Sequence, residues 1–172
     1  MGLLRLAMAG AFPFALAAGG WTSLGVFAVA ATSDYVDGPL ARRSGRTTPY
    51  GALLDAVADV VFVLTGTIAA AASDRLSWLV PLAIAGSATA YLVASVRRSR
   101  TSGRPARSYS LLGHAAGVSN YALVGLVAGS VALPSAVWPA LLAAGGVIVV
   151  ALNAGALFLR ALPARGAGAS PA

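Results

Sequence analysis

Six runs of apolar residues alternate with short polar segments along the chain. The runs cover residues 3–18, 21–42, 51–72, 77–96, 110–132 and 138–160. Most are about as long as the roughly 20 residues that a helix needs to cross the hydrocarbon core of a bilayer. The pattern predicts an all-α integral membrane protein with six transmembrane helices. Residues 1–162 would form one transmembrane domain, and residues 163–172 a disordered C-terminal tail.

The first run, residues 3–18, contains Arg5 near its start and Pro13 towards its end. Its length also fits the apolar core of a signal peptide. However, the small residues at 17–20 lead directly into the next apolar run and not into a polar domain. We therefore interpret residues 3–18 as a short, kinked first span, with a signal peptide as the alternative.

The composition supports a membrane protein, since 58% of the residues are hydrophobic, only 10% are charged and the mean hydropathy is +0.81. A pI of about 11.1 is also common in nucleic-acid-binding proteins. Here the basic residues stand in short segments between apolar runs, so we expect no nucleic-acid partner and instead contacts with membrane lipids. The chain has no cysteine, which excludes disulfides and thiolate metal sites.

The basic residues are divided unequally between the two predicted membrane faces. Six spans place both termini on one side, and of the twelve basic residues only Arg75 falls on the other side. Because short arginine-rich segments stay in the cytoplasm, the bias predicts cytoplasmic N- and C-termini for a multi-pass protein of the cell membrane. The polar segments 43–50 and 97–107 would face the cytoplasm as well.

Four of the five acidic residues fall within residues 34–59. Asp34 and Asp37 are three residues apart, and Asp55 and Asp59 are four apart, so each pair would share one face of a helix. Eight residues separate Arg42 from Gly51, a length that lets the second helix run back beside the first. The spacing therefore predicts that all four carboxylates meet at one depth, below the cytoplasmic membrane face.

Four carboxylates in one place repel one another unless cations neutralise them. Two divalent ions would balance the charge, and ligands that are all oxygens favour Mg²⁺, Mn²⁺ or Ca²⁺. Two such ions suit phosphoryl or nucleotidyl displacement. Gly38, Ala41 and Gly51 would let a ligand approach the backbone, and Arg42 could bind a phosphate. A membrane cation-binding or transport site is the alternative, but it gives these last four residues no task.

The order D-x2-D-G-x2-A-R-x8-G-x3-D-x3-D, from Asp34 to Asp59, resembles the signature of the CDP-alcohol phosphotransferase family, with all eight specified positions filled. The resemblance implies a six-helix membrane enzyme, active as a homodimer, that moves a substituted phosphate from a CDP-linked donor to an alcohol and releases CMP. Residues 1–162 would then be the catalytic domain, with its active site open to the cytoplasm.

The resemblance also implies a role for each motif residue. Asp34, Asp37 and Asp55 would bind the two ions, Mg²⁺ or Mn²⁺, while Asp59 would lie close to one ion and act as the general base. The residues expected around the CDP donor are Asp34, Gly38, Ala41, Arg42 and Gly51.

The segment 48–51 (T-P-Y-G) is similar to the T-x-F-G segment of phosphatidylglycerophosphate synthases, which use CDP-diacylglycerol, but Ala56 and Val60 depart from that subgroup. The expected acceptor is a phosphorylated polyol such as glycerol 3-phosphate. Inositol phosphate, phosphatidylglycerol or another alcohol remain open. A phosphorylated acceptor would need cations beside the metal site, and the candidates at span ends are Arg97, Arg98, Arg107 and Arg160.

A few polar residues fall inside the last two runs. We interpret these as hydrogen-bonded contacts between helices, with binding of the acceptor as the alternative. The residues are His114, Ser119, Asn120, Tyr121 and Asn153. Asp74, the only acidic residue outside the motif, is expected to cap a helix or to pair with Arg75.

Overall fold

A computed structural model describes residues 2–43, 49–102 and 111–161, with side chains described for 3–33, 54–96 and 111–161. Within these residues the chain forms six helices and no strand, as the sequence predicts. The helices are α1 (Gly2–Ala18), α2 (Trp21–Arg43), α3 (Pro49–Ala72), α4 (Leu79–Ser102), α5 (Leu111–Ala132) and α6 (Trp138–Ala161).

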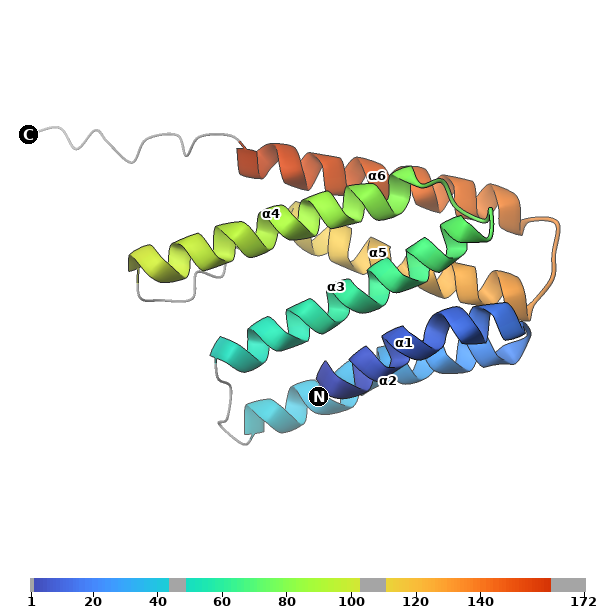
Figure 1. Ribbon diagram of the computed structural model, residues 1–172, viewed down its shortest axis with the longest axis horizontal. Coiled ribbons are helices and arrows are strands. Elements are labelled where there is room, and N and C mark those ends of the chain that lie inside the picture. Colours follow the sequence, from blue (N-terminus) through green and yellow to red (C-terminus); the bar gives the residue numbers. More distant parts are fainter. Residues whose placement is uncertain (1, 44–48, 103–110, 162–172) are drawn as a thin grey trace, which may run out of the picture.

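The six helices lie side by side along one common direction, and helices that follow one another in the sequence run in opposite directions (Figure 1). The connections α1 to α2, α3 to α4 and α5 to α6 lie at one end, which we call the turn end. The opposite end, which we call the motif end, holds the last turns of α2 and the first turns of α3. The start of α1 and the end of α6 point towards the motif end, so the helical part of the chain begins and finishes on the same side of the bundle.

Each helix packs against at least two of the others. Helix α1 packs against both α2 and α3, and α5 packs against α2, α3 and α6, while α4 covers α6 and α3. The apolar core follows these contacts, with Phe12 of α1, Phe62 of α3 and Val124 of α5 fully buried. The core therefore runs between α1, α3 and α5, and this packing positions the side chains discussed below.

The turns at the turn end use residues that tolerate a left-handed backbone. Gly19 and Gly20, with φ of 76° and 63°, reverse the chain between α1 and α2. Asp74 has a φ of 56°, and the amides of Asp74 and Arg75 donate to the carbonyls of Ala71 and Ala70. This is a Schellman ending of α3, so the expectation that Asp74 caps a helix is confirmed.

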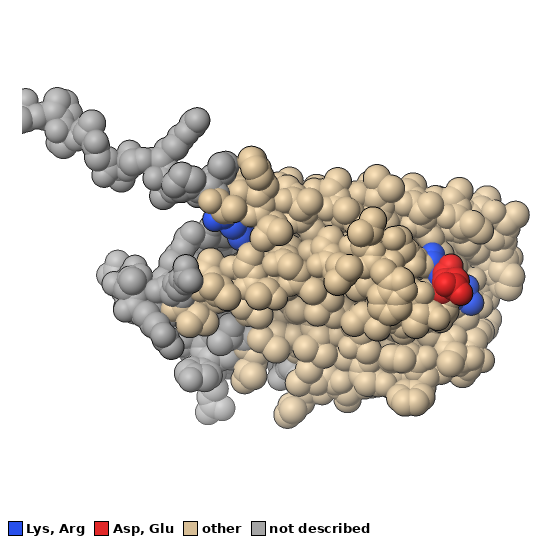
Figure 2. All heavy atoms as spheres, turned by 45° about the horizontal axis from the view of Figure 1, so that its top comes forward, with Lys and Arg blue, Asp and Glu red and all other residues tan. Residues whose placement is uncertain are grey.

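Four helices are long and apolar enough to cross a membrane: Leu54–Ala72, Leu79–Val96, Leu111–Ala132 and Trp138–Ala161. Within the described residues, the segments of the other two helices that qualify as apolar are shorter, Leu3–Ala18 and Trp21–Ser33. Figure 2 shows a flank without charge between two charged ends, as expected for a surface that contacts lipid tails. The membrane character is thus supported, while the count of six spans stays a prediction.

All three tryptophans stand at the turn end of the bundle. Trp21 opens α2, Trp78 directly precedes α4 and Trp138 opens α6. Trp21 and Trp78 are exposed, and the indole N–H of Trp138 donates to the carbonyl of Leu133. Tryptophan is enriched where a membrane meets water, so these residues are placed as an interfacial belt would be.

Candidate active site

The motif residues lie on two helices, near the helix ends that stand at the motif end of the bundle. The last turns of α2 carry the first part, and the first turns of α3 carry Gly51, Asp55 and Asp59. Both aspartate pairs therefore stand on helices, as their spacing predicts. Six of the eight motif residues fall outside the residues whose side chains are described, namely Asp34, Asp37, Gly38, Ala41, Arg42 and Gly51.

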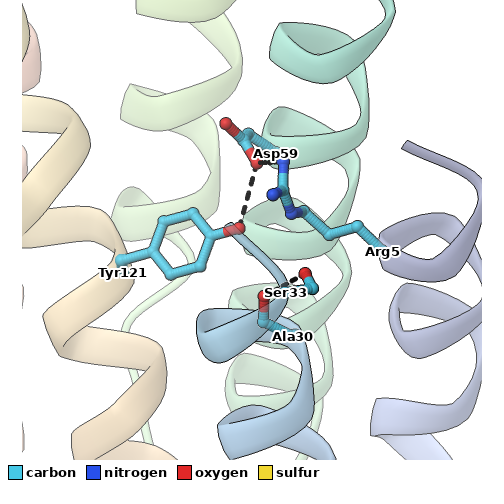
Figure 3. A network of polar contacts seen from close by, with 5 residues as sticks. All are labelled: Arg5, Ala30, Ser33, Asp59 and Tyr121. Atoms are coloured by element: carbon cyan, nitrogen blue, oxygen red, sulfur yellow. Dashed lines mark hydrogen bonds and ion pairs between the residues drawn. The ribbon is translucent and has the colours of Figure 1, made fainter. Parts of the chain in front are cut away.

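The carboxylate of Asp59 joins three helices through one of its oxygens. Nη1 of Arg5, from α1, donates to Oδ1 of Asp59 on α3 and forms an ion pair with it. The hydroxyl of Tyr121, from α5, donates to the same oxygen at 3.0 Å. Figure 3 shows this arrangement, with the second carboxylate oxygen of Asp59 pointing away from both donors.

The two charged partners differ in their access to solvent. The side chain of Arg5 is 3% exposed, whereas that of Asp59 is 36% exposed. A guanidinium buried among apolar helices is stable only when it is paired and hydrogen-bonded, and Asp59 meets that need. The carboxylate is thus held on the Arg5 side and accessible on the other side, as a group that meets a substrate must be.

An aromatic cluster lies directly beneath Asp59. Phe62 is three residues after Asp59 on α3, so the two side chains share a face of that helix. The ring of Phe62 stacks on Tyr121 with centroids 5.7 Å apart and an interplanar angle of 26°. Phe12 meets Phe62 edge-on at 5.7 Å, and Phe27 lies at 6.5 Å. Tyr121 is therefore fixed at its ring by Phe62 and at its hydroxyl by Asp59.

Asp55 is the other motif carboxylate whose side chain is described. It is exposed and stands one turn before Asp59 on the same helix face, towards the motif end. Two hard oxygen donors on successive turns fit a divalent ion such as Mg²⁺. No group of three or more potential ligand side chains gathers among the described residues, which include only this half of the tetrad. The meeting of all four carboxylates stays a prediction.

Of the four arginines proposed for the acceptor, Arg160 has a described side chain. Arg160, near the end of α6, donates from Nη1 to the carbonyl and hydroxyl oxygens of Ser87 on α4, at 3.2 and 3.3 Å. Its guanidinium also lies 5.4 Å from the centre of the Tyr91 ring. Arg97 and Arg98 stand in the last turns of α4 with side chains outside the described set, and Arg107 lies outside the described residues.

The polar residues of the last two helices divide into three groups. Nδ2 of Asn153 donates to Oδ1 of Asn120 at 2.8 Å, which confirms the expected contact between α5 and α6. The Ser119 hydroxyl donates to its own helix, and His114 is exposed. Tyr121 was expected to make a hydrogen-bonded contact between helices, and its bond from α5 to α3 confirms this; the partner, a motif carboxylate, was not expected.

Sequence reasoning thus missed two neighbours of Asp59. Arg5 was interpreted only as part of the positive charge on the cytoplasmic side, and Tyr121 as a hydrogen-bonded contact between helices or a residue that binds the acceptor. The same feature of the sequence could have indicated both residues, because each is a polar side chain inside an apolar run. Such residues are by default candidates for a functional site.

The sequence model of a protein family described as CDP-alcohol phosphatidyltransferase matches residues 1–157. The chain belongs to this family. The eight motif positions indicated this family, and the match to residues 1–157 confirms it over most of the chain. The family is named for the transfer of a phosphatidyl group from a CDP-alcohol, and the apolar helices of this chain agree with a membrane protein.

Curated relatives come from two kinds of transferase. The chain is 40% identical over 86 residues to a CDP-diacylglycerol–glycerol-3-phosphate 3-phosphatidyltransferase of Pseudomonas fluorescens, covering 46% of this chain and 44% of that one. A protein of the same name from Yersinia enterocolitica is 38% identical over 72 residues, 42% and 40% of the two chains. A cardiolipin synthase (CMP-forming) of Streptomyces coelicolor is 34% identical over 98 residues, 56% and 44%.

These matches span less than half the length of each of the three relatives. No solved structure matches the chain significantly.

Proposed function

We propose that the protein transfers a phosphatidyl group from CDP-diacylglycerol to an alcohol and releases CMP. The observation that carries this proposal is the complete eight-position motif, Asp34 to Asp59, in a chain that the family model covers from residue 1 to 157. The described geometry supports it, because Asp59 combines a fixed oxygen with partial exposure at the motif end.

The proposed acceptor is a phosphorylated polyol, with glycerol 3-phosphate first. Two of the relatives are named for transfer to glycerol 3-phosphate, and their names also specify CDP-diacylglycerol. The cardiolipin synthase is named as CMP-forming, and its similarity keeps phosphatidylglycerol as the second acceptor to be tested. Phosphorylated inositol is the third acceptor to be tested.

In the proposed reaction Asp59 accepts the proton of the acceptor hydroxyl. The hydroxyl oxygen then forms a bond to the phosphorus attached to diacylglycerol, and the bond between that phosphorus and the CMP oxygen breaks. Arg42 would neutralise part of the negative charge of the pyrophosphate, and Gly38, Ala41 and Gly51 would leave room for the CDP group.

Two divalent ions, Mg²⁺ or Mn²⁺, held by Asp34, Asp37, Asp55 and Asp59, would supply the charge stabilisation that this displacement needs. The donor set fits them, because it consists only of carboxylate oxygens. Asp55 and Asp59 present two of these groups from adjacent turns of α3.

The proposed topology has six spans, with the motif end and both termini in the cytoplasm and the active site open to it. The arginine bias of the sequence supports this orientation, and the three tryptophans at the turn end would then mark the outer membrane surface. Residues 1–162 would form the catalytic domain and residues 163–172 a tail. A homodimer is the proposed assembly, carried over from the family.

The test is a transfer assay with purified protein, CDP-diacylglycerol and a panel of alcohols, in which released CMP is measured. We expect release with Mg²⁺ or Mn²⁺ present and the highest rate with glycerol 3-phosphate. Asp59→Asn should still bind the donor while kcat falls by roughly 10²–10⁴, the usual contribution of a general base. Asp34→Asn should lose metal and donor binding together. Absence of CMP release with every acceptor would overturn the proposal.

A further inference from the structure

Arg5 and Tyr121 both donate to Oδ1 of Asp59, from two helices that flank α3. We propose that they are positioning residues that fix the plane of the Asp59 carboxylate and turn Oδ2 towards the substrate. This inference rests on the proposed function, because it assigns the proton-accepting atom of the same site. Neither residue belongs to the motif, which runs from Asp34 to Asp59.

A carboxylate needs such support because its terminal torsion is broad and roughly two-fold, so that the two oxygens of a lone Asp exchange easily. A general base must reach the acceptor hydroxyl at about 2.6–3.2 Å. Arg5 and Tyr121 both donate to Oδ1, and Arg5 is charged. They favour the one orientation of the carboxylate in which Oδ1 faces these two donors. The other oxygen then points outward, as Figure 3 shows.

The donors can do this only if they are themselves held in place. The ring of Tyr121 stacks on Phe62, which is one turn from Asp59 on the same helix. Helix α3 therefore supplies both the carboxylate and the surface that aims the hydroxyl at it. Arg5 is buried on α1, and the same helix sends Phe12 into the same aromatic cluster. Both donors are thus tied to one rigid group of rings.

A different role would be to hold α1, α3 and α5 together, with no effect on the chemistry. The two roles predict different measurements. A purely structural contact, once lost, lowers the thermal stability of the enzyme and leaves kcat per folded molecule unchanged. A positioning contact, once lost, lowers kcat while the donor still binds.

The decisive variant is Tyr121→Phe, because it keeps the ring on Phe62 and removes only the hydroxyl. We expect kcat to fall by about 10–100-fold, as for other partners that orient a catalytic group. The KM of the donor and its equilibrium binding should change less than about twofold. Ser130→Ala is the matched control, since it also removes one hydroxyl from α5, whose partner is the Val127 carbonyl of the same helix. It should leave kcat unchanged.

For Arg5 the series is Arg5→Lys and Arg5→Met. Lysine keeps the positive charge but lacks the rigid fork of guanidinium, so it should retain more of kcat than methionine does. If Arg5→Met fails to fold, the lysine variant and Tyr121→Phe still decide the question. Equal kcat for wild type and Arg5→Lys, together with an unaffected Tyr121→Phe, would overturn the proposal.

The closing experiment is a double-variant cycle with Asp59→Asn. If Tyr121 acts through the carboxylate, Tyr121→Phe should have less than about a twofold effect on kcat in the Asp59→Asn background, because there is no base left to orient. Independent, multiplicative losses of kcat would show that Tyr121 acts elsewhere and would refute the inference.

Failure of the proposed function can be told apart from failure of this inference. Wild type that releases no CMP would refute both. Active wild type in which neither Tyr121→Phe nor Arg5→Lys lowers kcat would refute the inference alone.

Discussion

Gly125 offers a sharp test of the packing beneath the site. It stands on α5, one turn after Tyr121, and a methyl group added there would lie 2.8 and 3.0 Å from two atoms of the Phe27 ring. Such contacts are too short for carbon atoms, so Gly125→Ala must displace either Phe27 or α5. Gly117 is on the same helix, and a methyl group there would meet nothing within 4 Å.

The Phe27 ring is partly buried, and the core beside it blocks its movement inward. It lies 6.5 Å from Phe62, which is fully buried between Phe12 and Tyr121. Overpacking a tight core costs about 1–3 kcal/mol. Both Gly→Ala changes gain the same helix propensity of about 0.5–1 kcal/mol, which therefore cancels when the two variants are compared. Gly125→Ala should be about 1–3 kcal/mol less stable than Gly117→Ala.

For a chain of this length the difference corresponds to a Tm gap of roughly 2–12 °C. It can be measured by thermal unfolding of both variants in the same detergent, followed by far-UV circular dichroism. In a Phe27→Leu background the gap should shrink, because the smaller side chain leaves room for the methyl group. A Gly125→Ala protein as stable as Gly117→Ala would refute the packing argument, and with it the claim that the rings under Asp59 are tightly held.

The remaining predictions concern topology, metal and the end of α6. The chain has no cysteine, so single cysteines at positions 103 and 136 can be labelled without background; position 103 should react only from the cytoplasmic side and position 136 only from outside. A chelator should abolish CMP release and Mg²⁺ or Mn²⁺ should restore it, and full activity in chelator would exclude the two-metal site. Arg160→Ala should raise the acceptor KM selectively if Arg160 binds the acceptor; a lowered Tm with unchanged KM would show instead that its bonds to Ser87 only join α6 to α4.

The helices were predictable because their limits follow from local chemistry. The predicted run at 21–42 corresponds to Trp21–Arg43, and the run at 51–72 to Pro49–Ala72, where proline suits the first helical position. Helix α4 is the clearest deviation, since it extends to Ser102 although its apolar run ends near residue 96. Arginine and serine end a hydrophobic run without ending a helix, because they are compatible with helical backbone in water.

The surroundings of Asp59 could not be predicted in the same way. Spacing within one helix gives the faces of Asp55 and Asp59, but Arg5 is 54 residues from Asp59 and Tyr121 is 62 residues from it. When a helix is apolar on nearly all of its faces, its sequence does not indicate which face packs against which other helix. The contacts become visible only when α1 and α5 are packed on the two sides of α3.

The contacts around Asp59 both stabilise the helix bundle and orient the carboxylate. Most substitutions there would therefore change stability and orientation together. Arg5 and Asp59 neutralise each other's charge, so removal of the Asp59 carboxylate leaves the buried Arg5 guanidinium without its counter-charge, which is costly. The rings below them connect α1, α2, α3 and α5, so loss of a ring weakens the core and the orientation of Tyr121 together. Only a change that keeps every ring and every charge, and removes a single donor, acts on orientation alone. Of the three residues joined at Oδ1, Tyr121 is the one that permits such a change, because phenylalanine preserves its stacking on Phe62.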